Sequence, residues 1–274
     1  MMATAADPYL EEAIEVTSRV ARTFSLAIRF LPAPLRHDVY LLYLVCRTLD
    51  DLVDDGHPQA GRRLQEVRAW ATGEGGALDR EEVILDHLCR RHPAMPRDAI
   101  ADFCEAQLMS IGPVRIETEE ALDRYSYGVA GTVGRLMAGI LGTSDGRADA
   151  AARALGIAMQ RTNILRDLDE DLSKGCIYLP EATLRRFGIE DLGRDDRSAL
   201  LRYQITVAEQ WYDIGLAGIR YLRVGGWQVR AAALMYRAIL QQIEADGLGR
   251  RRPHRASVPT PRKLLLVTQA LVNM

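Results

Sequence analysis

Cysteine, lysine and long apolar runs are scarce in this chain of 274 residues. The four cysteines have no Cys-x-x-Cys spacing and no secretory signal precedes them, so we expect reduced thiols in a cytoplasmic protein. Runs such as Val39–Val45 are too short to span a bilayer. A net charge of −2, without a basic helix carrying interleaved aromatics, argues against nucleic acid as a partner.

Alternating β-branched residues are also scarce, whereas Ala, Leu, Arg and Glu recur with helical spacing. We expect helices over residues 8–22, 34–56, 61–72, 79–91, 97–112, 117–142, 147–173, 197–223, 227–246 and 260–273. Without an internal repeat or a long linker, residues 1–274 are predicted to form one all-α domain, a helical bundle.

Two stretches interrupt the helical pattern. Gly175–Asp196 includes Tyr-Leu-Pro and could close over a site. Gly247–Pro261 contains four arginines, and three interpretations stay open for it: a solvated loop, a diphosphate contact, or attachment to an anionic membrane surface.

An acid-rich segment ends the helix expected over 34–56. Arg47, Asp50, Asp51 and Asp54 are spaced by three, one and three residues, which places them on one helical stripe. A solvated helix end is the simpler interpretation. However, such dense like charges repel, and the macrodipole disfavours anions at a helix C-terminus. We therefore expect a cation to bind these carboxylates, as Mg²⁺ would when it holds a diphosphate.

A second acid-rich segment carries the sharper signal. Gln160, Asn163, Asp167 and Asp171 are spaced by three, four and four residues, with Arg166 beside them. Their oxygens are the hard ligands that Mg²⁺ prefers, and the arginine could hold a phosphate. One Asp-x-x-x-Asp arises often by chance, but two, each with its own arginine, form a strong signal. The absence of Glu-x-x-His argues against a di-iron bundle.

A glycine-rich element lies between the two acidic segments, at Tyr125–Gly134. Glycines weaken a helix, so their presence needs a reason. Close helix packing is one reason, and space for a long apolar ligand is another. In the second case Tyr125 or Tyr127 would lie at the reacting end of that ligand.

With these motifs the chain resembles the squalene/phytoene synthases, the head-to-head branch of the trans-isoprenyl diphosphate synthases, over nearly its whole length. The matching segments are Ala21–Ser25, Cys46–Asp54, Tyr125–Gly134, Gln160–Asp171, Tyr236–Glu244 and Arg262–Leu264. The resemblance implies a bundle of the isoprenoid synthase type with a central apolar cavity. It also implies a transferase that joins two prenyl diphosphates through a cyclopropylcarbinyl diphosphate.

The resemblance further assigns roles to residues. Asp50, Asp54, Asp167 and Asp171 would hold Mg²⁺, with Asp51 in support. Diphosphate and substrate contacts would come from Arg22, Arg47, Gln160, Asn163, Arg166 and Tyr236. Tyr125, with the four metal-binding aspartates, would be catalytic, because it matches a tyrosine that the family uses near proton removal.

The chain departs from the family pattern at Cys176, where the family usually has an arginine that would contact a diphosphate. The leading prediction is condensation of farnesyl diphosphate to presqualene diphosphate and on to squalene or a related C30 chain. The alternatives are a C40 phytoene synthase or a class I terpene cyclase using the same site, and a non-catalytic assembly partner. Chain length would depend on residues that cap the cavity, with Ile28, Leu136 and Ile140 as candidates.

Three further properties stay open at this stage. A requirement for NADPH cannot be read from the sequence, because some relatives use it without a glycine motif for dinucleotides. A hydrophobic product suggests peripheral contact with the inner face of the membrane. The oligomeric state is not indicated.

Overall fold

In the computed structural model, residues 6–75 and 78–272 are described, except for the side chains of Asp7, Arg22 and Thr23. Helices form nearly all of the regular structure, and no strand occurs among the described residues. The prediction of an all-α fold is therefore confirmed.

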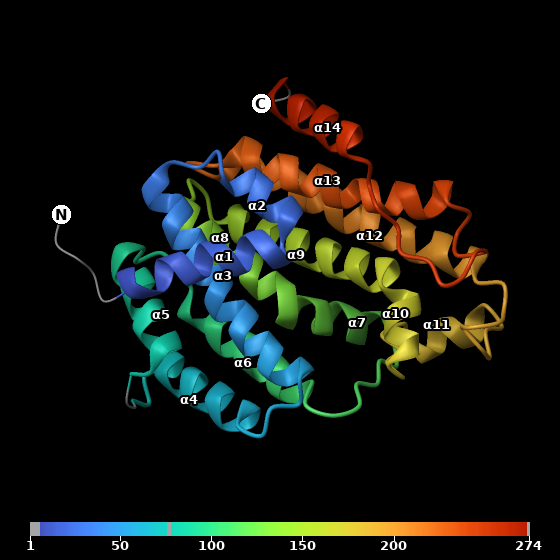
Figure 1. Cartoon of the computed structure of the whole chain (residues 1–274), viewed down its shortest axis with the longest axis horizontal. Coiled ribbons are helices and arrows are strands. Elements are labelled where there is room, and N and C mark those ends of the chain that lie inside the picture. Colours follow the sequence, from blue (N-terminus) through green and yellow to red (C-terminus); the bar gives the residue numbers. More distant parts are fainter. Residues whose placement is uncertain (1–5, 76–77, 273–274) are drawn as a thin grey trace.

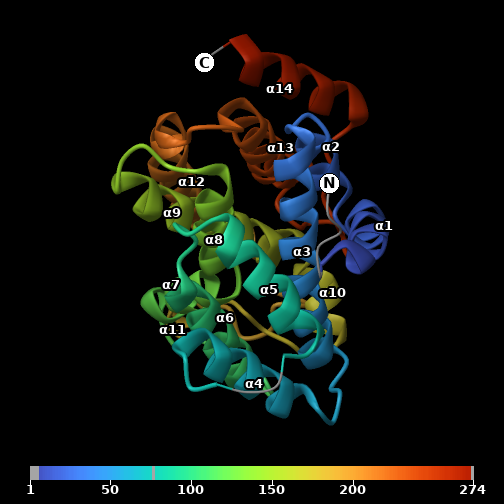
Figure 2. The ribbon, with the colours of Figure 1, turned by 90° about the vertical axis from the view of Figure 1, so that its left-hand side faces the viewer.

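The helices follow one another along the chain with short connections. They are η1 (Asp7–Tyr9), α1 (Leu10–Val20), α2 (Arg22–Ile28), α3 (Ala33–Asp54), α4 (Ala60–Thr72), α5 (Arg80–Arg91), α6 (Arg97–Met109), α7 (Glu119–Ser126), the π-helical turn η2 (Tyr127–Gly131), α8 (Thr132–Leu141), α9 (Arg147–Arg166), α10 (Leu168–Ser173), α11 (Glu181–Arg186), α12 (Ser198–Gly218), η3 (Ile219–Tyr221), α13 (Gly226–Ala245) and α14 (Thr260–Val272). Figures 1 and 2 show α14 on the outer edge of the bundle, over α13.

Two of the expected helices are divided. The helix expected over 8–22 ends at Val20, and a separate α2 follows Ala21, which has φ −111° and ψ 56°. The helix expected over 147–173 stops at Asp167, where φ is −98° and ψ is 8°. Neither break contains Gly or Pro, so the sequence carried no signal for it. The stretch predicted to be irregular after Gly175 contains the short α11.

Helix α9 packs between two neighbours through small residues. A Cβ on Gly134 of α8 would lie 2.3 Å from the Ala152 carbonyl oxygen, and one on Gly156 would lie 2.3 Å from the Ala130 carbonyl oxygen. On its other side, a Cβ on Gly218 of α12 would lie 2.0 Å from the Ala151 Cβ. The glycine-rich element therefore serves close helix packing, as one of its two interpretations predicted.

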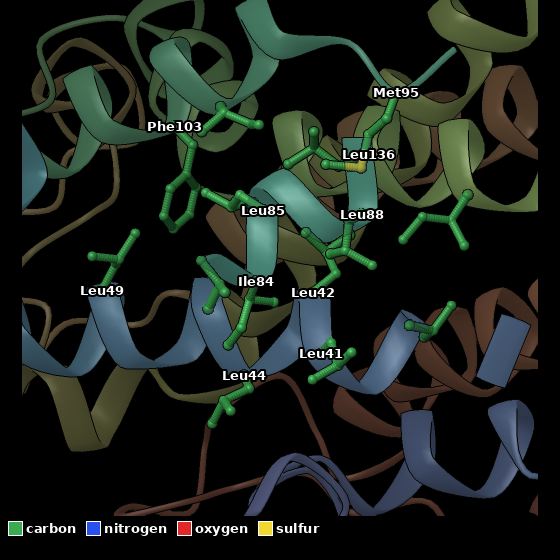
Figure 3. Packing of buried hydrophobic residues seen from close by; sticks show 14 of the residues in the cluster. Leu41, Leu42, Leu44, Leu49, Ile84, Leu85, Leu88, Met95, Phe103 and Leu136 are labelled. Atoms are coloured by element: carbon green, nitrogen blue, oxygen red, sulfur yellow. The ribbon is translucent and has the colours of Figure 1, made fainter. Parts of the chain in front are cut away.

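The largest apolar cluster joins α3, α5, α6 and α8 (Figure 3). Leu42, Leu85, Leu88 and Leu136 meet there and are almost completely buried. Leu136, together with Ile140, belongs to this cluster and not to the wall of the cavity described below. Both are therefore excluded as caps of that cavity, and the expectation was wrong for them because their faces of α8 pack inward against the core.

Candidate active site

A cavity of about 630 Å³ runs between α2, α3, α8, α9 and α13. Its walls are mostly apolar and include Phe24, Ile28, Val133, Met137 and Leu155. One end is polar, and nearly all of the site residues expected from the sequence gather there. They are Arg47, Asp50, Asp54, Tyr125, Gln160, Asn163, Arg166, Asp167, Asp171 and Tyr236. The side chain of Arg22 lies outside the described residues.

The first acidic segment occupies the last two turns of α3. Arg47 Nη1 donates to Asp50 Oδ2 at 3.3 Å and also pairs with Asp51, which points away from the cavity. Gln107 of α6 donates to Asp50 Oδ1 at 2.8 Å. Burial, and then the neighbouring charge of Asp54, raise the pKa of Asp50 to about 6. Without a bound cation, this carboxylate is thus costly to ionise.

The second acidic segment spans the break between α9 and α10. Arg166 Nε donates to Asp167 Oδ1 at 2.8 Å, and Arg255 Nε lies 2.9 Å from the same oxygen. Asp171 pairs with no arginine of the described residues, and burial followed by the charge of Asp167 raises its pKa to about 6. Asp54 contributes to that rise as well, so the two segments lie within electrostatic reach of one another.

The donor set at this end of the cavity fits Mg²⁺ that is held jointly with a substrate. Among the described residues, no three His, Cys, Asp or Glu side chains converge on a single ion position. Mg²⁺ typically takes one or two carboxylates and completes its shell with waters and phosphates. Asn163 Nδ2 donates to Gln160 at 3.4 Å, while its buried Oδ1 has no hydrogen-bond partner among the described residues. Such an orphaned acceptor at the site can accept from a ligand or a bound water.

The two tyrosines of the glycine-rich element face opposite sides. Tyr125 lines the cavity and stacks on Tyr178, with ring centroids 5.4 Å apart. Burial raises the pKa of the Tyr125 phenol, which therefore stays protonated. Tyr127 instead bonds to Asp102 and accepts a hydrogen bond from Arg135 at 3.0 Å, outside the cavity. Of the two candidates, only Tyr125 is placed to meet a ligand.

Sequence reasoning did not single out Arg255, which lines the cavity from the segment Gly247–Pro259, here called the strap. A smaller cavity of about 240 Å³ adjoins it, and Arg166, Arg255 and Lys263 all line this second space. The four strap arginines look alike in sequence, so only the folded chain shows which one faces the acidic segments. Cys176 is exposed and does not line the cavity.

Comparison with known proteins gives consistent matches. The family model described as squalene/phytoene synthase matches residues 17–262. A phytoene synthase of Thermus thermophilus is 38% identical over 274 residues, covering 91% of this chain and 89% of that protein. A 15-cis-phytoene synthase of Synechocystis is 35% identical over 290 residues, covering 95% and 85%. The crystal structure of a dehydrosqualene synthase in complex with ligand superposes with a TM-score of 0.85 and 25% identity, covering 98% of this chain and 97% of that one.

Proposed function

The chain belongs to the squalene/phytoene synthase family, and on that premise we propose that it condenses two molecules of geranylgeranyl diphosphate head to head into phytoene. The observation that carries the proposal is a long apolar cavity with both acidic segments and three arginines at one end. A prenyl diphosphate has the same polarity, with a charged head on an apolar tail. Membership of the family makes the chain a prenyl-group transferase, and the proposal concerns its substrate and product.

The carboxylates of the two segments would hold Mg²⁺, which when bound neutralises the charge of a leaving diphosphate. Arg47, Arg166 and Arg255 would donate to diphosphate oxygens, since guanidinium groups bind phosphates bidentately. The apolar walls would keep water away from the allylic cation that the departing diphosphate leaves behind. The double bond of the second substrate attacks this cation, and loss of a proton closes the cyclopropane ring.

A second ionisation expels the other diphosphate, and the rearranged cation loses a second proton to give the hydrocarbon. Tyr125 lines the cavity together with the carboxylates and the apolar wall, which supports a role for it where a proton leaves the carbon skeleton. This route ends in proton loss and consumes no reductant. We therefore propose that turnover does not require NADPH.

The C40 product replaces the C30 product as the leading interpretation. Both curated relatives compared above carry the name phytoene synthase. Ile28 is the only one of the three expected caps that lines the cavity among the described residues.

The proposal is tested by incubating purified protein and Mg²⁺ with geranylgeranyl or farnesyl diphosphate, with and without NADPH. Extracted products are identified by mass spectrometry. We expect a C40 hydrocarbon from geranylgeranyl diphosphate without NADPH, and slower turnover of farnesyl diphosphate. Preferential formation of a C30 product would restore the farnesyl interpretation, and a C20 product from a single substrate would indicate a cyclase.

We also propose that an anionic bilayer is a peripheral partner. No helix of the described chain is long and apolar enough to cross a membrane. However, Leu264, Leu265 and Leu271 lie on the outer face of α14 and are at least 50% exposed. After Asp246 the sequence contains six Arg or Lys residues and no Asp or Glu. An exposed apolar face beside a basic segment is typical of helices that lie in the interface of a membrane.

A further inference from the structure

One acidic residue of the second segment does not face the cavity. Asp169 lies between Asp167 and Asp171, yet its side chain is only 8% exposed and it is absent from the cavity wall. Its Oδ1 lies 2.6 Å from Nη1 of Arg197, and its Oδ2 accepts the backbone N–H of His254 at 2.7 Å. Asp169 therefore connects α10 to the start of α12 and to the strap.

Arg197 in turn contacts the backbone of the strap. Its side chain is 3% exposed, and its guanidinium packs against Gly249. A Cβ on Gly249 would lie 2.5 Å from Arg197 Nε, and the φ of Gly249 is +70°, which disfavours other residues. Arg252 Nε donates to the Gly249 carbonyl at 2.9 Å and a further bond joins Arg252 to the Asp195 carbonyl. The strap is thus fixed at positions 249, 252 and 254.

Arg255 is the residue next to the fixed His254 backbone. Besides its contact with Asp167, its Nη1 lies 3.2 Å from Glu170 Oε2. The side chain of Arg255 is itself 59% exposed, so contacts of its own side chain hold it only weakly. Its placement at the polar end of the cavity depends instead on the backbone of the strap.

We propose that Asp169 is a positioning residue that, through Arg197 and the His254 backbone, holds Arg255 where it binds substrate diphosphate. This inference rests on the proposed function of the cavity. Arg255 thus brings a guanidinium from the strap to the polar end of the cavity. Elsewhere this chain has Cys176 at a position where its family usually has an arginine. A buried ion pair often stabilises a fold less than apolar residues of similar volume would. It does, however, fix one geometry of the groups that it joins.

The test is a double-mutant cycle between Asp169 and Arg255, read as the inhibition constant of inorganic pyrophosphate in the presence of Mg²⁺. We expect Arg255→Ala to weaken pyrophosphate binding about tenfold or more, because it removes charged hydrogen bonds. Asp169→Ala should weaken it by a similar factor. The double variant should bind no more weakly than Arg255→Ala, because both changes remove the same contact.

Three further variants separate positioning from folding. Asp169→Asn keeps an acceptor for only one of the two donors, Arg197 or His254, and should recover only part of the affinity. Gly249→Ala keeps both Asp169 and Arg197 but places a Cβ against the Arg197 guanidinium at a φ of +70°, so it displaces the strap and should weaken pyrophosphate binding as Arg255→Ala does. Arg251→Ala removes one positive charge from the exposed surface of the strap and should change nothing.

The outcomes discriminate between the possibilities. If Asp169→Ala and Gly249→Ala lower the melting temperature but leave pyrophosphate binding and KM unchanged, Asp169 is structural only and the inference is wrong. Additive losses in the cycle would also overturn it. Calorimetric binding of Mg²⁺ and pyrophosphate needs no turnover, so the cycle can be read even if geranylgeranyl diphosphate is not the substrate.

Discussion

The two acidic segments have the same spacing in sequence but are built in different ways. Asp50 and Asp54 lie one turn apart on the uninterrupted helix α3, and their arginine comes from the same helix. Asp167 lies at a helix break and Asp171 lies in the short helix that follows it, and one of the arginines at Asp167 comes from the strap. The first segment is therefore a local structure, whereas the second needs contacts between distant parts of the chain.

The two segments also differ in their electrostatics. In the first segment burial raises the pKa of Asp50, and Arg47 only partly offsets it. In the second segment two arginines surround Asp167, while the pKa of Asp171 is raised to about 6. Each segment thus contains at least one carboxylate that is costly to ionise without a cation, since burial also raises the pKa of Asp54, and this fits the proposed metal site.

The largest expected effect comes from removing one of these two carboxylates. Asp50→Asn and Asp171→Asn should each lower kcat by about a thousandfold, comparable with the loss of a main electrostatic contact to a transition state. The double variant should be little worse than either single one, because both segments serve one cluster. Single-turnover assays on folded variants, checked by circular dichroism, measure this. If only one of the two single variants lost kcat, the two segments would not act together.

The pH dependence should reflect these raised pKa values, most strongly those of Asp50 and Asp171. Mg²⁺ binds ionised carboxylates, so its apparent affinity should fall as the pH drops below about 6, by roughly tenfold per unit for each group. The pKa values of Asp50 and Asp171 are raised in the folded chain, so folding binds protons. In the metal-free protein these two groups therefore contribute stability that is lost as the pH rises from about 4 to 6.

Thermal unfolding across that range, with and without Mg²⁺ and pyrophosphate, checks both signs. Asp50→Asn should remove the share of Asp50 in the pH dependence and leave the share of Asp171. An Asp50→Asn variant with the same pH dependence as the unchanged protein would contradict the raised pKa of Asp50.

The same comparison explains what the sequence could predict. Asp50 and Asp54 follow from helical periodicity, because an intact helix converts spacing directly into geometry. The break at Asp167 contains no Gly or Pro, and Arg255 comes from a segment 85 residues further along the chain, so no local pattern encodes either feature. Helical periodicity puts Tyr125 and Tyr127, two residues apart, on opposite faces but does not say which face is inward, and only the resemblance to the family favoured Tyr125.

A smaller effect should follow from restoring an arginine at position 176. The backbone N–H of Cys176 donates to the Asp171 carbonyl at 2.9 Å, so this position lies close to the second segment. Cys176→Arg should tighten pyrophosphate binding about threefold, in the range of a partly exposed charged contact. In the Arg255→Ala background it should recover most of the lost affinity. Cys176→Ala is the matched control, and no recovery would show that the two positions do not substitute for one another.

The smallest effect on turnover should come from substitutions in α14, the helix that follows the strap. In the described part of the chain, the first acidic segment is not connected to a helix of this kind. The double variant Leu264→Glu/Leu271→Glu places two negative charges on the apolar face that would meet an anionic bilayer. Because burying those charges is costly, we expect loss of flotation with vesicles rich in phosphatidylglycerol, while turnover in detergent stays within about twofold. Met109→Glu, at a residue that is 75% exposed on α6, is the control and should leave flotation intact.

Salt distinguishes the two contributions to this binding. Raising the ionic strength should weaken flotation of the unchanged protein, since the strap arginines act through a screened surface potential. Vesicles of phosphatidylcholine alone should retain little protein. If the double variant instead converts a dimer into a monomer in sedimentation experiments, and vesicle binding is unchanged, the face of α14 joins two copies of the chain. The connection from the second acidic segment through the strap would then lead to a subunit interface and not to a membrane.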